Sequence, residues 1–240
     1  MSKNIDISVV VPAYNEEDFL PKSLGSLTKQ DTLLNYEIIV VDNNSSDKTR
    51  EVSEEYGVLV VYEERQGVGW ARKTGTAYAN GIIIVHIDAD TVVPKDYLED
   101  IKDHFKHDED LVCLGGQFFY YDAPVWKEFL RKIMYKPVYY FARISSRGKL
   151  GPTGGNMAFR KSIYDKTSGF NPNLKFGEDG DLTMRLSSLG KIKVDMDLKC
   201  GVSVRRFNFD KDFFLYAINF LSLCLRGKPY KNELSSHEDK

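Results

Sequence analysis

Four short apolar runs, separated by stretches of helical length, constrain the fold of this chain more than any other feature. The runs are rich in Val and Ile and lie at residues 7–11, 36–41, 58–62 and 82–87. Continuous apolar strands of this kind are typical of a parallel sheet that is covered by helices on both faces. The stretches that predict those helices lie at residues 16–29, 47–56 and 68–80. We therefore predict an α/β fold built from βαβ units.

Beyond residue 110 the pattern is more mixed. It predicts a strand at 111–120, a long helix at 124–145 and a short strand at 156–160. Pro137 is expected to kink or divide the long helix, because proline removes a helical hydrogen bond. Leucines spaced by four and then three residues predict a further helix at 178–188.

Length and composition narrow the class of protein. The 240 residues allow one sizeable core, so we expect a single domain over residues 1–227 and a flexible tail over 228–240. A net charge of −2 provides no overall electrostatic footprint for nucleic acid. The three cysteines are widely spaced, which fits neither a disulfide framework nor a paired-cysteine metal site and favours a cytoplasmic location. The longest apolar segment, at 213–225, is too short to cross a bilayer.

Polar, turn-forming residues follow three of the predicted strands, at residues 12–16, 42–47 and 88–90. Right-handed crossovers bring the carboxyl ends of parallel strands to one edge of the sheet, and open α/β sheets bind their ligands there. We therefore expect a binding site at this edge.

Asp88 and Asp90 stand two positions apart, directly after the apolar run at 82–87. In an extended chain their side chains share one face, so both can approach one hard cation directly or through water. A Mg²⁺ or Mn²⁺ ion there could bridge the two phosphates of a nucleoside diphosphate and assist its departure. The alternative is an acidic turn that caps the next helix. Two carboxylates at a strand end repel each other unless a cation or donors balance them, which favours the metal site.

Three segments together resemble the successive nucleotide-binding signatures of family 2 inverting glycosyltransferases, in the same order and with matching spacing. These segments are residues 10–17, 40–49 and 88–90. The resemblance continues through residues 65–80, 154–156 and 177–182, and so covers residues 5–205. It implies the GT-A fold, which has a mostly parallel central sheet flanked by helices. Residues 1–110 would form its nucleotide-binding half and residues 111–227 its acceptor-side half.

For the donor, a UDP- or GDP-sugar, the resemblance implies a set of contacts at the sheet edge. They are Pro12, Ala13, Tyr14 and Glu16 around the base and ribose, Asp42 at the nucleoside, Arg72 at the diphosphate, and Gly154 and Gly155 beside the sugar. Asp88 would hold the ribose or a metal-bound water, and Asp90 the metal, Mn²⁺ or Mg²⁺. Alternatively, Glu16 and Asp42 could cap helices and Arg72 could lie on a solvated helix face. A dinucleotide loop is discounted, because the third glycine of its motif is missing.

On the acceptor side, Glu178 and Asp179 resemble the family's acidic dipeptide, in which the Asp is the general base. Inversion requires a carboxylate that removes a proton from the attacking hydroxyl, and we assign that role to Asp179. Asp181 is the competing candidate, and capping of the following helix is the structural alternative for Asp179.

The sequence departs from the family pattern in two places. Many relatives supply a metal-binding His from the segment at residues 200–206, and this chain has none there. The metal would then be held mainly by Asp90, water and phosphate, and Arg205 or Arg206 could assist the diphosphate. The QxxRW motif of processive synthases is also missing, so we expect one sugar to be transferred per visit.

The segment at residues 124–150 is cationic and aromatic. It contains seven basic residues and one acid, a net charge of 7 − 1 = +6, interleaved with aromatic side chains. Such a segment suits peripheral contact with an anionic membrane and an acceptor that is lipid-linked or part of a cell-surface glycan, at the cytoplasmic face. Alternatively, the aromatics belong to the core and the cations to a solvated face. The helical segment at residues 210–225 could form the interface of a homodimer.

Two other classes of function remain to be compared. A catalytically inactive nucleotide-sugar binder or accessory protein would keep the fold, but the retained Asp88, Asp90 and Asp179 favour a metal-dependent hexosyltransferase. A sugar nucleotidyltransferase should have a Gly-rich, basic phosphate loop after its first strand. Here that position holds the residues PAYNEE, from 12 to 17.

Overall fold

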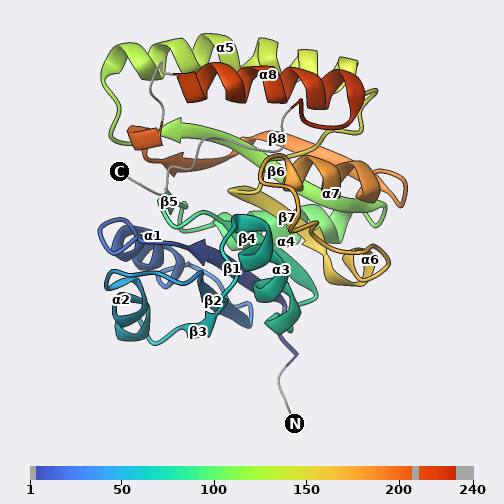
Figure 1. The fold of residues 1–240 in the computed structure, drawn as a ribbon. Helices are drawn as coiled ribbons and strands as arrows, with labels where there is room; N and C mark the ends of the chain where they lie inside the picture. Colours follow the sequence, from blue (N-terminus) through green and yellow to red (C-terminus); the bar gives the residue numbers. More distant parts are fainter. Residues whose placement is uncertain (1–3, 207–210, 231–240) are drawn as a thin grey trace.

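The computed structural model describes residues 4–206 and 211–230 and shows an α/β fold around a curved, mixed sheet (Figure 1). The strands are β1 (Ile7–Ala13), β2 (Tyr36–Asp42), β3 (Leu59–Tyr62), β4 (Ile83–Ile87), β5 (Thr91–Val92), β6 (Leu111–Tyr120), β7 (Asn156–Arg160) and β8 (Lys191–Val202). The α-helices are α1 (Leu20–Leu27), α2 (Thr49–Glu55), α3 (Val68–Tyr78), α4 (Tyr97–His107), α5 (Val125–Ser145), α6 (Lys161–Tyr164), α7 (Glu178–Leu186) and α8 (Lys211–Arg226).

The first four strands form the parallel part of the sheet that the apolar runs predict. Their order is β3-β2-β1-β4, and each neighbouring pair runs parallel. The register pairs Ala13 with Asp42, so β1 and β2 end at the same level. The loops after β1 and β2 therefore leave the sheet side by side, at the edge where the sequence predicts a binding site.

The second half of the sheet has mixed directions. β7 runs antiparallel to both β4 and β6, β6 pairs parallel with β8, and β5 closes the order as an antiparallel partner of β8. The strands at 111–120 and 156–160 are confirmed, whereas α4, β5 and β8 were not predicted. The predicted helix at 178–188 is confirmed as α7, which ends at Leu186.

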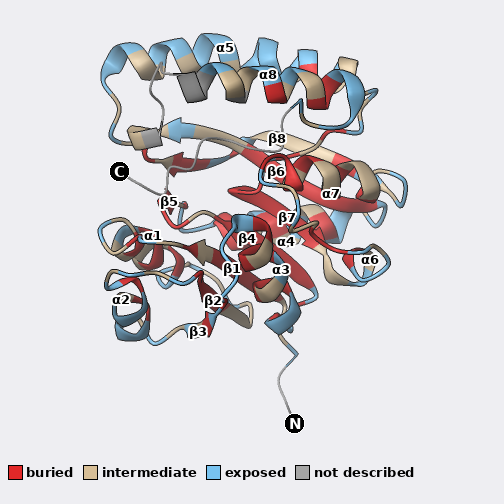
Figure 2. Cartoon of the chain, viewed as in Figure 1, coloured by how far each residue is buried: buried red, intermediate tan, exposed pale blue. Residues whose placement is uncertain are grey.

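Helices cover both faces of the sheet, as the continuous apolar strands require. One face packs against α1 and α4 through a core cluster that includes Val9, Leu24 and Ile101. The other face packs against α3 and α7 through a cluster that includes Val10 and Leu182. Figure 2 shows the buried residues concentrated in the strands and in the helix faces that touch them.

Helices α5 and α8 lie side by side outside these two layers, next to β8 (Figure 1). A small separate cluster joins them, which includes Ala142, Leu223 and Cys224. Pro137 lies inside α5 without dividing it, so the helix continues through 21 residues. Across the described residues, no helix combines the length and the apolar character needed to cross a membrane. The predicted tail lies outside the described residues from 231 onward.

Candidate active site

The loops that follow β1 and β2 are joined to each other by hydrogen bonds at the predicted edge. The N–H of Asn43 donates to the carbonyl oxygen of Ala13 at 2.8 Å, and the N–H of Glu16 donates to Oγ1 of Thr49 at 2.7 Å. Pro12 and Tyr14 are partly exposed on either side of Ala13. The structure therefore places the four predicted residues of the first loop beside the end of β2.

Asp42 shapes the loop at the end of β2. Its side chain is 4% exposed, and Oδ1 accepts the N–H of Ser45 at 2.9 Å. Helix α2 starts at Thr49, whose N–H is accepted by Oδ1 of Asp47 at 2.9 Å and not by Asp42. The alternative in which Asp42 caps a helix is therefore wrong, and the side chain instead closes the turn that carries the edge of the site.

Glu16 is buried and its carboxylate faces a distant arginine. Arg205 donates through Nη2 to this carboxylate at 2.5 Å and through Nε to Oδ2 of Asp90 at 3.2 Å. The Arg205 guanidinium also lies 3.9 Å from the centre of the Phe19 ring. The carboxylate of Glu16 thus takes part in this ion pair, while its carbonyl oxygen accepts the N–H of Leu20 at the start of α1 at 2.9 Å, so the two roles coexist. One guanidinium thus holds two carboxylates that come from the ends of β1 and β4.

Arg72 of α3 is the second cation of the site. It is 4% exposed, which shows that the alternative of a solvated helix face is wrong. Its guanidinium donates to Oδ1 of Asp88 at 2.8 Å and to the carbonyl oxygen of Gly154 at 2.6 Å, and Nε lies 3.3 Å from Oε1 of Glu178. A buried guanidinium with this many acceptors fixes the relative positions of the groups around it.

Gly154 and Gly155 pass close to this arginine and to Asp88. A Cβ atom on Gly155 would lie 2.3 Å from Oδ2 of Asp88, so a larger residue there requires the Asp88 carboxylate to move. The N–H of Gly154 donates to Oδ2 of Asp179 at 2.8 Å. Asp88, Arg72, Gly154 and Asp179 therefore form one continuous hydrogen-bonded chain across the site.

Glu178, Asp179 and Asp181 lie in the first turn of α7 and have three different environments. Burial and the neighbouring Asp179 raise the pKa of Glu178 to about 7, against the opposing effect of Arg72. Asp179 is partly exposed, and its Oδ1 accepts the N–H of Gly180 in the first turn of α7 at 2.6 Å, so its contact with the helix terminus coexists with its contact with the site. The N-cap residue itself is Gly177, in a left-handed conformation. Asp181 pairs with Arg185 at 2.6 Å on the next turn. Among the three, Asp179 combines contact with the site and access from outside.

The carboxylates at the strand ends suit a hard divalent cation in type. Asp88 and Asp90 offer the oxygen ligands that Mn²⁺ and Mg²⁺ accept. Arg72 and Arg205 already balance their charge, so the repulsion that favours a metal in the sequence is relieved here by arginine donors. Within residues 4–206 and 211–230, no group of three potential ligands comes together. A metal held here would take its remaining ligands from phosphate and water.

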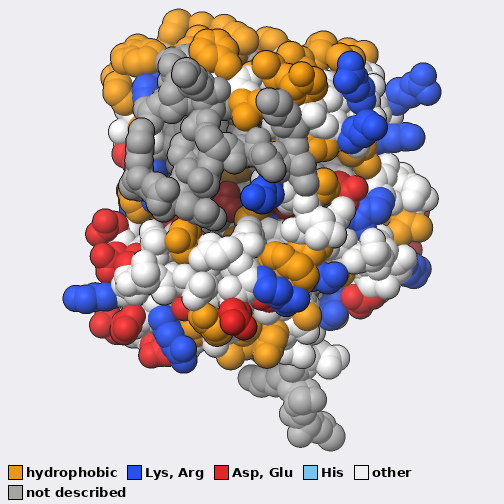
Figure 3. Space-filling model, in the orientation of Figure 1, with side chains coloured by type: hydrophobic (Ala, Val, Ile, Leu, Met, Phe, Trp, Pro, Cys, Tyr) orange, Lys and Arg blue, Asp and Glu red, His pale blue; other side chains and the backbone are white. Residues whose placement is uncertain are grey.

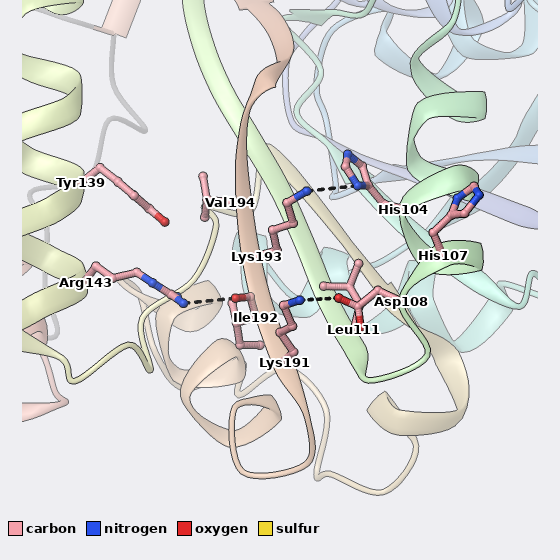
Figure 4. A pocket seen from close by; sticks show the side chains of 10 residues that line it. All are labelled: His104, His107, Asp108, Leu111, Tyr139, Arg143, Lys191, Ile192, Lys193 and Val194. Atoms are coloured by element: carbon pink, nitrogen blue, oxygen red, sulfur yellow. Dashed lines mark hydrogen bonds and ion pairs between the residues drawn. The ribbon is translucent and has the colours of Figure 1, made fainter.

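Two surface cavities lie away from this cluster. One, of about 330 Å³, is at the start of β6 and β8 under α5, and Figure 4 shows that its cations already have partners. Lys191 pairs with Asp108 at 2.5 Å and Lys193 contacts His104 at 3.3 Å. The other, of about 470 Å³, lies beside α3 and α7, and Asp181 is part of its wall. Neither is lined by Asp88, Asp90 or Asp179.

The arginines play a larger part in this site than the sequence predicts. Arg205 is expected there only to assist the diphosphate, whereas the structure joins it to Glu16 and Asp90. The local sequence signal for this was the lack of a His in the segment at residues 200–206.

The fold and the site together define the class of protein: an α/β domain with acidic residues at the carboxyl ends of its parallel strands and a further acidic pair across the site. Residues 8–168 match the family described as glycosyl transferase family 2, and the chain belongs to that family. Its structural neighbours are glycosyltransferases with the GT-A fold, which confirms the fold that the sequence predicts.

Individual relatives are similar to this chain over part of their length. The chain is 27% identical to the glycosyltransferase GlyA of Streptococcus pneumoniae over 77% of its own length and 28% of that protein. It is 29% identical to a dolichol-phosphate mannosyltransferase of Pyrococcus furiosus over 66% of its length and 47% of the relative. The chain thus spans less than half of either relative.

A solved structure matches most of the chain. It is a mannosyltransferase from Pyrobaculum calidifontis in complex with GDP-Man and Mn²⁺, with a TM-score of 0.68 and 20% identity, covering 93% of this chain and 64% of that one. At this identity the likeness establishes the fold alone.

Proposed function

We propose that this chain transfers a single sugar, most simply a hexose, from a UDP- or GDP-sugar to an acceptor hydroxyl with inversion at the sugar carbon. The observation that supports this best is the chain of contacts from Asp88 through Arg72 and Gly154 to Asp179. It links a donor-side carboxylate to an acceptor-side carboxylate through two groups, so a donor and an acceptor bound beside them would meet in one site. An in-line displacement needs these two kinds of group on opposite sides of the reacting carbon.

On the donor side, the loops after β1 and β2 enclose the nucleoside. Pro12, Ala13, Tyr14 and Glu16 surround the base and ribose, and Asp42 holds the nucleoside from the end of β2. Arg72 and Arg205 both carry positive charge toward Asp88 and Asp90, where the diphosphate would lie. Arginine binds phosphate oxygens through two parallel donors, so a small movement of either side chain would let it stabilise the leaving group.

Asp90, assisted by Asp88, would hold the divalent cation, Mn²⁺ or Mg²⁺, which neutralises charge on the departing diphosphate when it is bound. The solved mannosyltransferase with GDP-Man and Mn²⁺ supports the choice of metal. Gly154 and Gly155 would let the backbone approach the donor sugar, because they have no side chain. A side chain at either position would also push against Arg72 or Asp88.

On the acceptor side, Asp179 accepts the proton of the attacking hydroxyl as the new bond forms. Its two oxygens already accept N–H groups from Gly154 and Gly180, which hold the carboxylate in one orientation. Glu178 is only 7% exposed and lies against Arg72, so it positions Arg72 and has little access to an acceptor hydroxyl. Asp181 is occupied by Arg185.

The acceptor that we propose is lipid-linked or part of a cell-surface glycan, handled at the cytoplasmic face of a membrane. The similarity to a dolichol-phosphate mannosyltransferase supports an acceptor of this kind. The absence of the QxxRW motif from the sequence supports transfer of one sugar per visit.

A panel of nucleotide sugars, each tested for thermal stabilisation with and without Mn²⁺, tests the proposal. Only a matched donor binds the folded state tightly, so one donor should raise the melting temperature, and only with the metal. Asp90→Asn should abolish the shift, whereas Asp110→Asn, at an exposed carboxylate away from the site, should retain it. No metal-dependent shift with any donor would overturn the proposal.

The alternative function is a nucleotide-sugar binder without catalysis. Such a protein would show the same thermal shift but would release no nucleoside diphosphate from the matched donor. Measuring that release, with water or an added acceptor, separates the two functions.

A further inference from the structure

Helix α5 turns its apolar side chains away from the protein. Trp126, Phe129, Ile133, Tyr140 and Ile144 are spaced by three, four or seven residues, so they share one face of the helix. Each is more than half exposed, and Ile144 reaches 76%. The alternative in which the aromatics of this segment form core is therefore wrong for this face. We call this set of five residues the outer face of α5.

The opposite side of α5 meets the sheet through polar groups. Glu128 accepts the N–H of Tyr120 at 3.0 Å, and the Tyr135 hydroxyl donates to the carbonyl oxygen of Gly116 at 3.2 Å. Arg143 donates to the carbonyl oxygen of Ile192 at 3.4 Å. A surface helix of a globular domain normally has the reverse arrangement, with its apolar face inward. The surface that the outer face of α5 contacts therefore lies outside the described part of the chain.

Helix α8 extends the same surface. Phe214, Ile218, Leu221 and Leu225 are spaced by four, three and four residues and are all exposed, with Leu225 at 67%. Figure 3 shows hydrophobic side chains gathered along the end of the molecule that α5 and α8 form. Contiguous apolar surface across two helices marks a contact with a protein or a membrane, whereas isolated exposed apolar residues are ordinary.

Positive charge accompanies this surface. Residues 124–150 have a net charge of +6 in a chain whose total is −2. The single acid of the segment, Glu128, is paired with Arg131 at 2.7 Å. Lys132, Lys136 and Lys149 are exposed. The apolar surface is thus bordered by cations. A surface that binds it should be apolar in the centre and anionic at the edge.

We infer that the outer face of α5 and the exposed face of α8 dock onto the surface of an anionic lipid bilayer. A helix with apolar and aromatic residues on one side and lysines beside them lies in the plane of a membrane interface. Trp126 and Tyr140 fit the headgroup level, where amphipathic rings concentrate. A second copy of this chain is a poorer occupant, since two cationic faces would be brought together. This inference does not depend on the donor chemistry.

Flotation of the full chain with vesicles tests the inference. Vesicles of phosphatidylcholine alone are compared with vesicles that contain about 30% phosphatidylglycerol, at low and high salt. The chain should float with the anionic vesicles, less with the neutral ones, and less again when NaCl rises from about 0.1 to about 0.5 M.

Two sets of variants assign the binding to this surface. The triple variant Trp126→Ser, Ile133→Ser and Ile144→Ser should lower the partition coefficient by at least about tenfold, because each apolar side chain contributes on burial. The matched control is Leu33→Ser, Ile82→Ser and Leu189→Ser, which removes three exposed apolar side chains elsewhere and should float as the parent does. Lys132→Glu with Lys136→Glu should also lose at least about tenfold, whereas Lys29→Glu with Lys95→Glu should not.

Each result of these experiments either supports or overturns membrane docking. Flotation that is lost only in the variants of α5 supports a membrane-docking surface. Absence of flotation overturns it, and so does equal binding by both triple variants. A parent that is dimeric in light scattering, stays off the vesicles and becomes monomeric in the α5 triple variant would instead assign the surface to a second copy. Metal-dependent stabilisation by a nucleotide sugar should persist in the triple variant, so a failure of this inference is distinguishable from a failure of the proposed function.

Discussion

The guanidinium of Arg72 and the backbone of Gly154 are in direct contact, with Nη1 donating to the glycine carbonyl oxygen at 2.6 Å. A Cβ atom on Gly154 would lie 2.5 Å from Cζ of Arg72, so any other residue at position 154 requires the buried guanidinium to move. The same guanidinium holds Asp88 and Glu178. The approach of one loop to one buried arginine therefore sets the distance between the donor and acceptor sides of the site.

Gly154→Ala should destabilise the fold, because the buried arginine has no free space into which to move. We expect a loss of about 1–3 kcal/mol in the free energy of unfolding, the usual range for overpacking. Urea unfolding of the variant measures it. Gly25→Ala is the matched control: it lies inside α1, its nearest neighbour to an added Cβ is 3.9 Å away, and alanine there should be neutral or stabilising. Equal stability of the two variants would show that the Arg72 contact is not tight.

Arg72→Ala should be the most damaging single change in the site. It leaves Glu178 buried without its neighbouring cation, and above pH 7, where Glu178 is ionised, removing one partner of a buried ion pair costs about 3 kcal/mol or more. The partly exposed Asp88 also loses its cation. Arg50→Ala removes an exposed pair with Glu54 and should change stability by less than about 0.5 kcal/mol. Thermal and urea unfolding compare the two variants. A small effect at Arg72 would mean that water reaches the pair.

The pH dependence of stability should reveal Glu178. Its pKa rises from 4.5 to about 7 on folding, so the folded state holds a proton that the unfolded chain releases between these values. Stability should therefore fall as the pH rises through this window, by at most about 1.4 kcal/mol per pH unit, and level off above it. Glu178→Gln should remove this component of the slope, whereas Glu55→Gln, at an exposed position, should keep it. Urea unfolding at several pH values gives the slopes, and an unchanged slope in Glu178→Gln contradicts the assignment.

The first half of the fold was predictable from the sequence because its strands are buried on both faces. β1, β2 and β4 are continuous Val and Ile runs, and the polar residues that follow them mark the binding edge. β8 was missed although Ile192, Val194, Met196, Leu198 and Cys200 alternate along it. Charged residues between them lower its hydrophobicity, since one side of the strand is partly exposed. The position of β7 between β4 and β6, antiparallel to both, could not be predicted. The apolar pattern of a strand indicates that it is buried, but not which strands pair with it.

The acidic residues of the site were predictable, and their partners were not. Asp88, Asp90 and Asp179 stand in short motifs at element ends, so local sequence indicates them. Arg205 and Glu16 are 189 residues apart, and their ion pair depends on how the last strand returns to the first loop. The burial of Arg72 follows from the packing of α3 against the loop at Gly154, which no property of α3 alone reveals.

Arg205→Gln should change how the site binds a metal in the absence of donor. Arg205 neutralises Glu16 and Asp90, and removing its charge leaves two carboxylates that attract a cation more strongly. We expect Mn²⁺ alone to bind the variant more tightly than the parent, measured by the loss of the free-ion signal in electron paramagnetic resonance. Arg50→Gln, at an exposed arginine on α2, is the control. Weaker Mn²⁺ binding in Arg205→Gln would indicate that the arginine organises the site for the metal.

Asp179→Asn should separate catalysis from donor binding. Asparagine keeps one of the two oxygens that accept N–H groups from Gly154 and Gly180, so the loop stays in place, but it has no basic carboxylate to accept the hydroxyl proton. We expect kcat to fall by about 10²–10⁴, the usual contribution of a general base, while the affinity for the matched donor measured by calorimetry stays within about twofold. Asp181→Asn, which breaks only the pair with Arg185, should leave kcat near that of the parent. If the two variants lose activity equally, or if Asp181→Asn loses more, the general base is misassigned and the acceptor approaches from the side of α7 that Asp181 and Arg185 occupy.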